Sequence, residues 1–459
     1  MFRRNLGENP SFLDAHFVIG GPFLSRIPKT LGQAMLESKS VTALVPTNEA
    51  VRRFEERKRQ EGHDLNVVWS QIYQYHFLNL PLTASDLQEE VLTELRGNYP
   101  VYVTRTEHHD RRQSTIYLNN ARLLRHDIRG SVKDDLGMQE PQVMHIIDEV
   151  LEPIVPRIRN NKAPEASLFN PSAWELLDKS SEYNLALTKW RGIVMERNMQ
   201  DWYSGSELKT YFIPIDAGNR IEKGRLDDLA LAGHVIPGQV LFTRTLNSGS
   251  THGQAVKFES GVAELVASDK YQGRARNQAP KLKVMLSVKN ITSPDANRKM
   301  HTLLFAQSHT VVGDQLRKEG TVMVEIERAN IPVKNGVVHL IKRPLLTVDE
   351  TLTQLIEGNP DLKKFAELLK TQAPTTWNAI LRANEGTTVL APSDEAFNRM
   401  GRQTYTNLVS NRKRFEQIAS YHVVLEKFSI KNALNIKKSA TQDDEIIDEN
   451  EERLSIEVS

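Results

Sequence analysis

Histidines are the residues of this chain whose possible chemistry is easiest to define, because their setting repeats. Two of them follow a tyrosine and are flanked by aliphatic residues. An imidazole can exchange a proton near neutral pH, bind a metal, or donate one hydrogen bond and accept another. The apolar surroundings favour helix ends packed in a core, with each ring satisfied by hydrogen bonds. The competing interpretation is contact with a partner. The candidate partner-binding residues are Tyr75, His76, Tyr421 and His422.

Two other histidines, His145 and His339, lie in the apolar runs 143–151 and 337–346. A histidine in such a run is typical of a core, where its ring nitrogens bond backbone groups. The cluster at 108–110, His-His-Asp, has metal-ligating residue types. Neighbouring strand residues point to opposite faces, so we expect an exposed hairpin loop there and no metal site.

No catalytic set is recognisable in the sequence. It contains no Gly-x-Ser-x-Gly elbow, no phosphate-binding glycine-rich loop, no His-Glu-x-x-His pair and no Gly-x-Gly-x-x-Gly fingerprint. We therefore expect a protein that is not an enzyme and that uses no cofactor.

The composition is that of an ordinary globular protein. Of 459 residues, 25% are charged and 39% hydrophobic, and 59 basic residues nearly balance 58 acidic ones. A net charge of +1 predicts no nucleic-acid partner. The absence of cysteine excludes disulfides and thiolate sites. No apolar run is long enough to span a membrane.

A strand–proline–helix pattern occurs three times at domain-scale intervals. The segments are VTALVPTNEAVRRF at 41–54, KTYFIPID at 209–216 and TTVLAPSDEAFNRM at 387–400. Proline ends a strand because it cannot donate a ladder hydrogen bond. Thr47 or Asn48 can then cap the helix that follows. In the middle segment Gly218 is expected to weaken that helix.

The histidines divide the chain in the same way. Tyr75-His76 and Tyr421-His422 follow their prolines at the same interval, and the middle segment has Gly233-His234 instead. The apolar runs that contain His145 and His339 close the first two repeats. We therefore expect three domains. They are 1–155, 165–346 with an insertion, and 347–459, which lacks its closing strand and is truncated at its C-terminal end.

Secondary-structure patterns predict a mixed α+β chain. Strands are expected at 41–45, 101–105, 115–118, 143–148, 209–213, 282–288, 321–326, 337–341 and 387–391. Helices are expected at 48–60, 67–78, 85–93, 172–178, 183–201, 349–357, 360–370, 376–382, 394–400 and 404–422. The proline-rich stretch 153–171 is the expected first joint, 268–281 an exposed loop, and 439–453 an acidic solvated loop.

These motifs resemble those of fasciclin domains. VTALVPTNEAV and TTVLAPSDEAF are similar to the family's first motif, and VMHIIDEVL and NGVVHLIKRPLL to its second. The Tyr-His pair lies between them, as in the family. The middle domain departs from the pattern at Ile215, Gly233 and Lys342. The resemblance covers nearly the whole chain and implies tandem domains, each a β-wedge of two small sheets with packed α-helices.

The resemblance also implies an extracellular cell-adhesion protein, close to the insect neuronal fasciclin type, with periostin-like relatives. Its partners would be other cell-surface or matrix proteins, itself or integrins, met through domain surfaces. A signal peptide and a lipid anchor beyond this chain are implied as well. The alternatives are a ligand- or glycan-binding scavenger-type receptor ectodomain, favoured by a pocket in the middle-domain insertion, and an intracellular structural protein.

Two further features concern the surface. Asn290-Ile291-Thr292 is the one glycosylation sequon that proline does not block, so Asn290 is the candidate glycan acceptor of a secreted glycoprotein. A basic stretch suits either sulfated glycans and acidic partners or a solvated surface. It consists of Arg111, Arg112, Arg122, Arg125 and Arg129.

Overall fold

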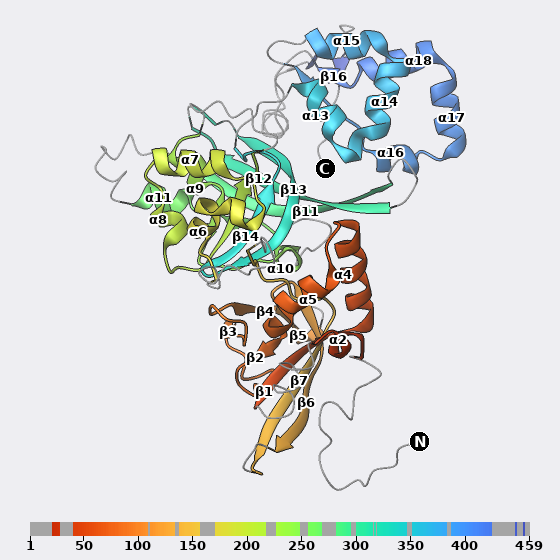
Figure 1. Cartoon of the computed structure of the whole chain (residues 1–459). Helices are drawn as coiled ribbons and strands as arrows, with labels where there is room; N and C mark the ends of the chain where they lie inside the picture. Colours follow the sequence, from red (N-terminus) through yellow and green to blue (C-terminus); the bar gives the residue numbers. More distant parts are fainter. Residues whose placement is uncertain are drawn as a thin grey trace. The chain divides into compact units, whose positions relative to one another are not determined.

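The computed structural model describes most of the chain (Figure 1). The described residues are 21–27, 40–108, 111–133, 137–156, 170–216, 226–247, 256–268, 281–294, 300–314, 316–317, 319–346, 351–382, 387–424, 446–447 and 453–454. Residues 109–110 of the His-His-Asp cluster, residues 269–280 of the expected loop, and most of the acidic stretch lie outside them.

The chain forms two compact units. The first comprises Met1–Asn290 and Leu304–Thr347, and the second comprises Ile291–Leu303 and Val348–Ser459. The first unit contains two seven-stranded sheets with helices beside them, and the second is mainly helical.

The first sheet has the strand order β2-β1-β7-β6-β5-β4-β3. Its strands are β1 (Val41–Pro46), β2 (Phe77–Leu78), β3 (Glu90–Leu92), β4 (Pro100–His108), β5 (Arg111–Leu118), β6 (Ala121–Lys133) and β7 (Gln139–Ile147). The helices are α2 (Gly21–Arg26), α4 (Asn48–Gln60), α5 (Leu65–Ile72) and the 3₁₀ turn η1 (Tyr73–His76). β5 and β6 share only the pairs Tyr117↔Arg122 and Leu118↔Ala121, so the sheet has two halves joined over a short stretch.

The second sheet repeats this order as β9-β8-β14-β13-β12-β11-β10. Its strands are β8 (Lys209–Pro214), β9 (Val235–Pro237), β10 (Phe258–Glu259), β11 (Lys283–Pro294), β12 (Met300–Val312), β13 (Gly320–Val333) and β14 (Gly336–Ile341). The helices are α6 (Ala173–Asp178), η3 (Ser180–Tyr183), α7 (Thr188–Glu196), α8 (Asp201–Ser204), α9 (Asp228–Ala232), α10 (Thr243–Asn247) and α11 (Val262–Ala267).

The second unit packs its helices around one apolar cluster that includes Phe365, Leu369, Phe397 and Phe415. Its helices are α13 (Leu352–Gly358), η5 (Pro360–Leu362), α14 (Lys363–Gln372), α15 (Pro374–Arg382), α16 (Asp394–Arg399), α17 (Arg402–Ser410) and α18 (Arg412–Ser420). Its strands are β15 (Thr388–Val389), β16 (Val423–Val424), β17 (Ile446–Ile447) and β18 (Arg453–Leu454). In the described part of this unit, β16 is the only strand that pairs with β15.

The two repeated motifs lie side by side in each sheet. β1 pairs with β7 in parallel from Val41↔Gln142 to Pro46↔Ile147, and β8 pairs with β14 in the same way. The strand that precedes each proline is therefore hydrogen-bonded to the strand that contains the closing histidine. This confirms that both motifs belong to one folding unit.

Helix caps explain why the first motif recurs. Thr47 caps α4 by accepting a hydrogen bond from the Ala50 N–H at 3.2 Å, as predicted, and Ser393 caps α16 in the same way. The middle repeat differs. Its Asp216 accepts hydrogen bonds from the backbone of Thr188 and Lys189, so it caps α7, which precedes it in the chain.

Several sequence expectations are wrong in detail. Residues 85–93 form a turn and the short strand β3, because Val91 is buried against the sheet and pairs with Val101. The helix expected over 67–78 ends at Ile72, and Phe77 is extended because it pairs with Ala43. The helix expected over 404–422 is interrupted at Asn411, whose side chain caps α18.

Candidate functional site

The Tyr75-His76 pair lies entirely inside the first domain. Both side chains have an exposed fraction of 0%. The Tyr75 hydroxyl donates to the Pro100 carbonyl at 2.6 Å and accepts from the Asn119 amide at 2.9 Å. Burial raises the pKa of Tyr75 far above its usual value. The phenol is therefore a neutral core group at physiological pH.

The ring of His76 joins two distant parts of the first domain. Its Nε2 accepts from the Leu151 N–H at 3.0 Å, so its Nδ1 carries the proton and faces the Ile72 carbonyl at 3.3 Å. Burial lowers the pKa of His76 to about 4, and the bond to Ile72 opposes this only in part. The expectation of a buried, hydrogen-bonded histidine is confirmed here.

The middle domain repeats this arrangement without the tyrosine. His234 faces the Ala230 carbonyl at 2.7 Å through Nδ1 and accepts from the Leu345 N–H at 2.7 Å through Nε2. Burial lowers its pKa to about 4 as well. A Cβ atom on Gly233 would lie 2.6 Å from Leu346 Cδ1. The leucine thus occupies the space that a side chain at position 233 would need.

The histidines of the closing strands use the opposite tautomer. His145 accepts from the Asp127 N–H at Nδ1, so its Nε2–H donates to the Leu82 carbonyl at 3.0 Å. His339 does the same with Asn330 and the Leu241 carbonyl. Asp127 and Asn330 adopt positive φ angles of 61° and 62° at the irregular positions of β6 and β13. Each histidine therefore stabilises a β-bulge, because it accepts the hydrogen bond of an N–H group that does not pair with the neighbouring strand.

These four rings have both nitrogens bonded to the backbone of their own domain. Burial lowers the pKa of His339 to about 4 and also lowers that of His145. None has a nitrogen available for a substrate proton. Across the described residues, no group of three or more histidine, aspartate or glutamate side chains is placed to hold a metal ion.

The pair in the second unit is more accessible. Tyr421 has an exposed fraction of 37%, and His422 is half-buried. The His422 Nδ1 faces the Leu390 carbonyl at 2.7 Å, and burial lowers its pKa. The side chain of Asn290 is exposed on β11. These positions are compatible with the predicted partner and glycan roles, which stay predictions.

A junction between the first two domains was not predicted from the sequence. Tyr102 of β4 is buried against Phe242 and Val337 of the second domain. Its hydroxyl donates to the Val333 carbonyl at 2.6 Å and accepts from the Gly336 N–H at 3.1 Å. A single tyrosine in a strand carries no sequence signal for such a contact.

An ion-pair cluster completes this junction. Arg244 of α10 binds Asp148 at 2.8 and 2.9 Å and Glu149 at 2.8 Å. Asn120 accepts from Arg244 N–H and donates to Glu149. Burial raises the pKa of Glu149, although Arg244 opposes the shift. The first and second domains are therefore joined by both apolar and charged contacts.

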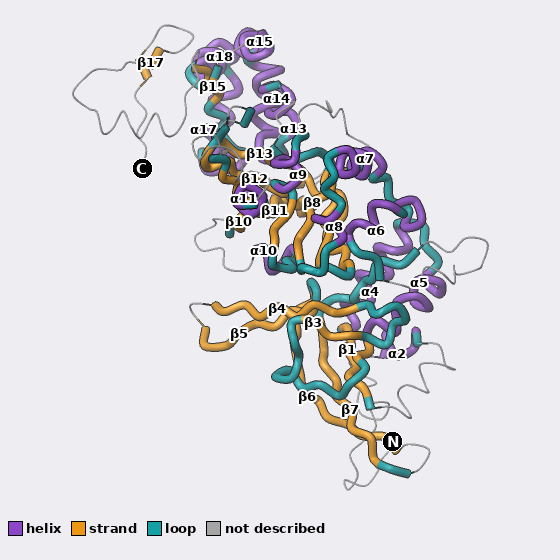
Figure 2. Tube along the Cα trace, turned by 90° about the vertical axis from the view of Figure 1, so that its left-hand side faces the viewer, coloured by secondary structure: helices purple, strands orange, loops and turns teal. Residues whose placement is uncertain are grey.

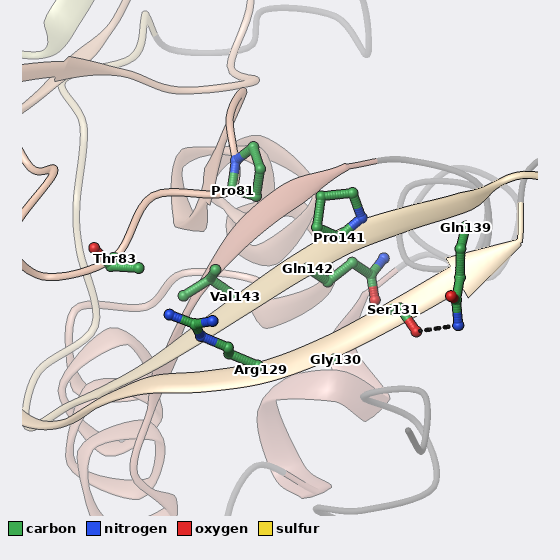
Figure 3. A pocket seen from close by; sticks show the side chains of 9 residues that line it. All are labelled: Pro81, Thr83, Arg129, Gly130, Ser131, Gln139, Pro141, Gln142 and Val143. Carbon is green, nitrogen blue, oxygen red and sulfur yellow. Dashed lines mark hydrogen bonds between the residues drawn. The ribbon is translucent and has the colours of Figure 1, made fainter. Parts of the chain in front are cut away.

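A shallow pocket of about 600 Å³ lies on one face of the β6–β7 hairpin (Figure 3). Its lining mixes amides, hydroxyls, prolines and one guanidinium. The lining residues are Pro81, Thr83, Arg129, Gly130, Ser131, Gln139, Pro141, Gln142 and Val143. The Gln139 amide donates to the Ser131 hydroxyl at 3.2 Å. The pocket belongs to the first domain and not to the middle-domain insertion.

Taken together, the fold and these buried histidines define a class of tandem α+β domains whose repeated histidines bond to their own backbone. The fasciclin domain family matches residues 23–153 and 360–459. The chain therefore belongs to the fasciclin family.

Curated relatives support this assignment. The chain is 32% identical to Fasciclin-1 of Schistocerca americana over 90% of its own length and 56% of the relative's. It is 30% identical to Fasciclin-1 of Drosophila melanogaster over 87% of its length and 54% of the relative's. The chain thus spans about half the length of these relatives, which belong to a cell-adhesion family.

More distant similarities were also found. Transforming growth factor-beta-induced protein ig-h3 of Sus scrofa is 29% identical over 21% of the chain and 14% of the relative. A solved FAS1 domain pair from the insect cell adhesion molecule Fasciclin I aligns with 68% of this chain and 90% of its own. Its TM-score is 0.26 and its sequence identity to this chain is 16%.

Proposed function

We propose that this chain is part of an extracellular cell-adhesion protein that works through contacts of its domain surfaces. The observation that carries the proposal is the family match at both ends of the chain, combined with identity to insect Fasciclin-1 over most of its length. The structural observations agree with it. The repeated histidines serve the fold, and the first two domains are tied together as a tandem.

The partners are other cell-surface or matrix proteins, including a second copy of the chain or an integrin. Part of this proposal concerns Tyr421 and His422. Because Tyr421 is partly exposed, its ring can meet a partner directly. Direct contact by Tyr75 and His76 would require the first domain to open, since both are fully buried. We therefore assign attachment to the pair in the second unit.

Extracellular placement is also part of the proposal. In the part of the chain that the structure describes, no helix is both long and apolar enough to cross a membrane. Asn290 lies exposed in a strand and is the proposed glycan acceptor. A mobility shift on treatment with a peptide N-glycosidase, lost in Asn290→Gln, would support secretion. A product that leaves a secreting cell without a glycan would refute the proposed role of Asn290 as a glycan acceptor.

Bead aggregation tests adhesion itself. Beads coated with the purified chain should cluster, or should attach to cells that carry the partner. Tyr421→Ala with His422→Ala should reduce attachment, while circular dichroism shows an unchanged fold. The control is Tyr405→Ala, a half-buried tyrosine in the same unit that packs against Phe397, with its fold checked in the same way. Absence of both clustering and attachment by the folded chain would contradict the proposal, and a signal confined to a glycan array would favour the receptor alternative.

A further inference from the structure

One edge of the first sheet is open beside the pocket. β6 runs from Ala121 to Lys133, but β5 pairs with it only at Ala121 and Arg122. Figure 2 shows β4 and β5 extending in a different direction from β6 and β7. From Ile128 to Lys133, β7 is the only described strand that pairs with β6. The other side of this stretch therefore has no strand neighbour in the described part of the chain.

Pro141 identifies which backbone groups face this open side. It lies opposite Ser131 in the β6–β7 ladder, and its carbonyl accepts a hydrogen bond from the Ser40 hydroxyl, just before β1. The Pro141 carbonyl thus points away from β6, and proline has no N–H to donate. Ser131 and Pro141 form a non-hydrogen-bonded pair. The N–H and carbonyl groups of Ser131 consequently point outward, and so do those of Arg129 and Lys133 by the two-residue period.

The side chains of these residues face the pocket or solvent beside it. Arg129 and Ser131 line the pocket together with Pro141 and Gln139 of the facing strand (Figure 3). Arg129 and Lys133 are exposed. An open strand with a pocket beside it has the two parts of β-strand addition, in which main-chain bonds give affinity and pockets read alternate side chains.

The charge of β6 indicates what kind of segment could pair with its open edge. β6 contains Arg122, Arg125, Arg129 and Lys133 against one acidic residue, Asp127, and Arg122 is paired with Asp148. Asp127 is already engaged, because it accepts from the Ala84 N–H and from His126. Asp134 and Asp135 follow in the sequence, so the basic character is confined to the strand.

A second copy of β6 is a poor partner. Antiparallel self-pairing about Ser131 would place Arg129 of one copy opposite Lys133 of the other, and like charges in opposed positions are destabilising. Basic residues on an open edge oppose self-association in this way. An extended acidic segment suffers no such repulsion and gains from both cations.

We propose that residues 129–133 of β6 bind an extended acidic segment of a partner protein as an added strand, with the adjoining pocket taking one of its side chains. This deepens the proposed function, because it names the surface and chemistry of one adhesive contact. The contact comprises outward N–H and carbonyl groups of Arg129, Ser131 and Lys133, flanked by two cationic side chains.

A peptide titration tests the proposal. Fluorescence anisotropy of a labelled, acetylated and amidated (Glu-Thr)₄ peptide is measured with the whole chain. We expect saturable binding that weakens by about tenfold or more in Arg129→Glu with Lys133→Glu. Arg412→Glu with Lys413→Glu, on α18, is the control with the same charge change, and both of its residues are exposed. Equal loss in the control would overturn the proposal.

Two further measurements separate strand addition from simple charge attraction. A (Glu-Pro)₄ peptide has the same charge but fewer N–H donors. We therefore expect its affinity to be lower than that of (Glu-Thr)₄ by about tenfold or more. Ser131→Pro removes one outward N–H and no main-chain bond to β7, although it also removes the side-chain bond from Gln139. It should weaken (Glu-Thr)₄ binding while circular dichroism is unchanged. If this variant does not fold, the charge-reversal pair with its control decides.

Other results would overturn the inference. Equal binding of both peptides would indicate charge alone. Edge-dependent binding of a sulfated oligosaccharide without peptide binding would indicate a glycan site. Self-association abolished by Ser131→Pro would indicate a second copy. Bead clustering that persists in edge variants that no longer bind the peptide would leave the adhesion proposal intact and place that adhesion on another surface.

Discussion

Mild acid should destabilise the second domain, because its fully buried histidines His234 and His339 must stay neutral. The half-buried His309 of β12 has its pKa lowered to about 4 by burial as well, so it adds to the effect of these two. Burial lowers the pKa values of His234 and His339 from 6.5 to about 4. Between these values the unfolded chain binds more protons than the folded one. Stability is therefore complete above about pH 6.5, falls as the pH decreases towards 4, and changes little from this source below it.

The magnitude follows from the size of the shift. A displacement of this size corresponds to about 3 kcal/mol per histidine in full, of which about 2 kcal/mol is lost by pH 5. The two rings together should therefore cost the second domain about 4 kcal/mol between pH 7.5 and pH 5. This is a large part of the stability of an ordinary domain, which is about 5–15 kcal/mol.

Urea unfolding at several pH values measures this effect. Tryptophan fluorescence can follow this unfolding, because three of the five tryptophans, Trp174, Trp190 and Trp202, lie in the second domain and the ring of Trp190 is 4.7 Å from that of His234. His234→Gln does not titrate in this range, so its unfolding free energy should depend on pH by about 2 kcal/mol less than that of the parent chain. His63→Gln, at an exposed position after α4, is the matched control. A full pH dependence in His234→Gln would refute the reasoning.

Three other predictions concern the folded state. Tyr102→Phe removes the hydroxyl bonded to Val333, so the unfolding free energy of the first unit, measured in urea, should fall by about 1–3 kcal/mol. An unchanged unfolding free energy would mean that the junction is not coupled to folding. Thr47→Ala removes the cap of α4 and should lower the unfolding free energy by about 1 kcal/mol, whereas Thr47→Ser should not. Gly233→Tyr should cost about 1–3 kcal/mol by overpacking, and Leu346→Ala in the same chain should reduce that cost, as a double-mutant cycle would show. Additive effects would contradict the proposed competition for space.

The sequence predicted the parts of the fold that depend on local rules. Strand ends at proline, the Thr47 and Ser393 caps and the core positions of His145 and His339 were all predictable, because each follows from residue type and immediate neighbours. The pairing of the repeated motifs within one sheet followed from their repetition. The same rules failed where distant contacts decide, as at residues 85–93, which pairing with β4 makes extended.

The candidate surfaces were less predictable for the same reason. Tyr102 and Arg244 meet residues far away in the sequence, and neither lies in a recognisable motif. Repetition alone did not show that Tyr75 and Tyr421 differ in exposure. Only packing reveals that Tyr75 is enclosed by Pro100 and Asn119. The open side of β6 depends on where β5 leaves the ladder, which residue patterns do not specify.

The hydrogen bonds that His76 and His234 accept from the segments after the closing strands have a mechanical consequence. Leu151 and Leu345 follow the closing strands β7 and β14, and their N–H groups donate to His76 and His234. Tension applied along a tethered chain would reach these bonds before it reaches the parallel pairing of β1 with β7 or of β8 with β14. The same protonation that weakens a domain would thus lower the pulling force at which its exit segment detaches, so resistance to load should decrease in acidified surroundings.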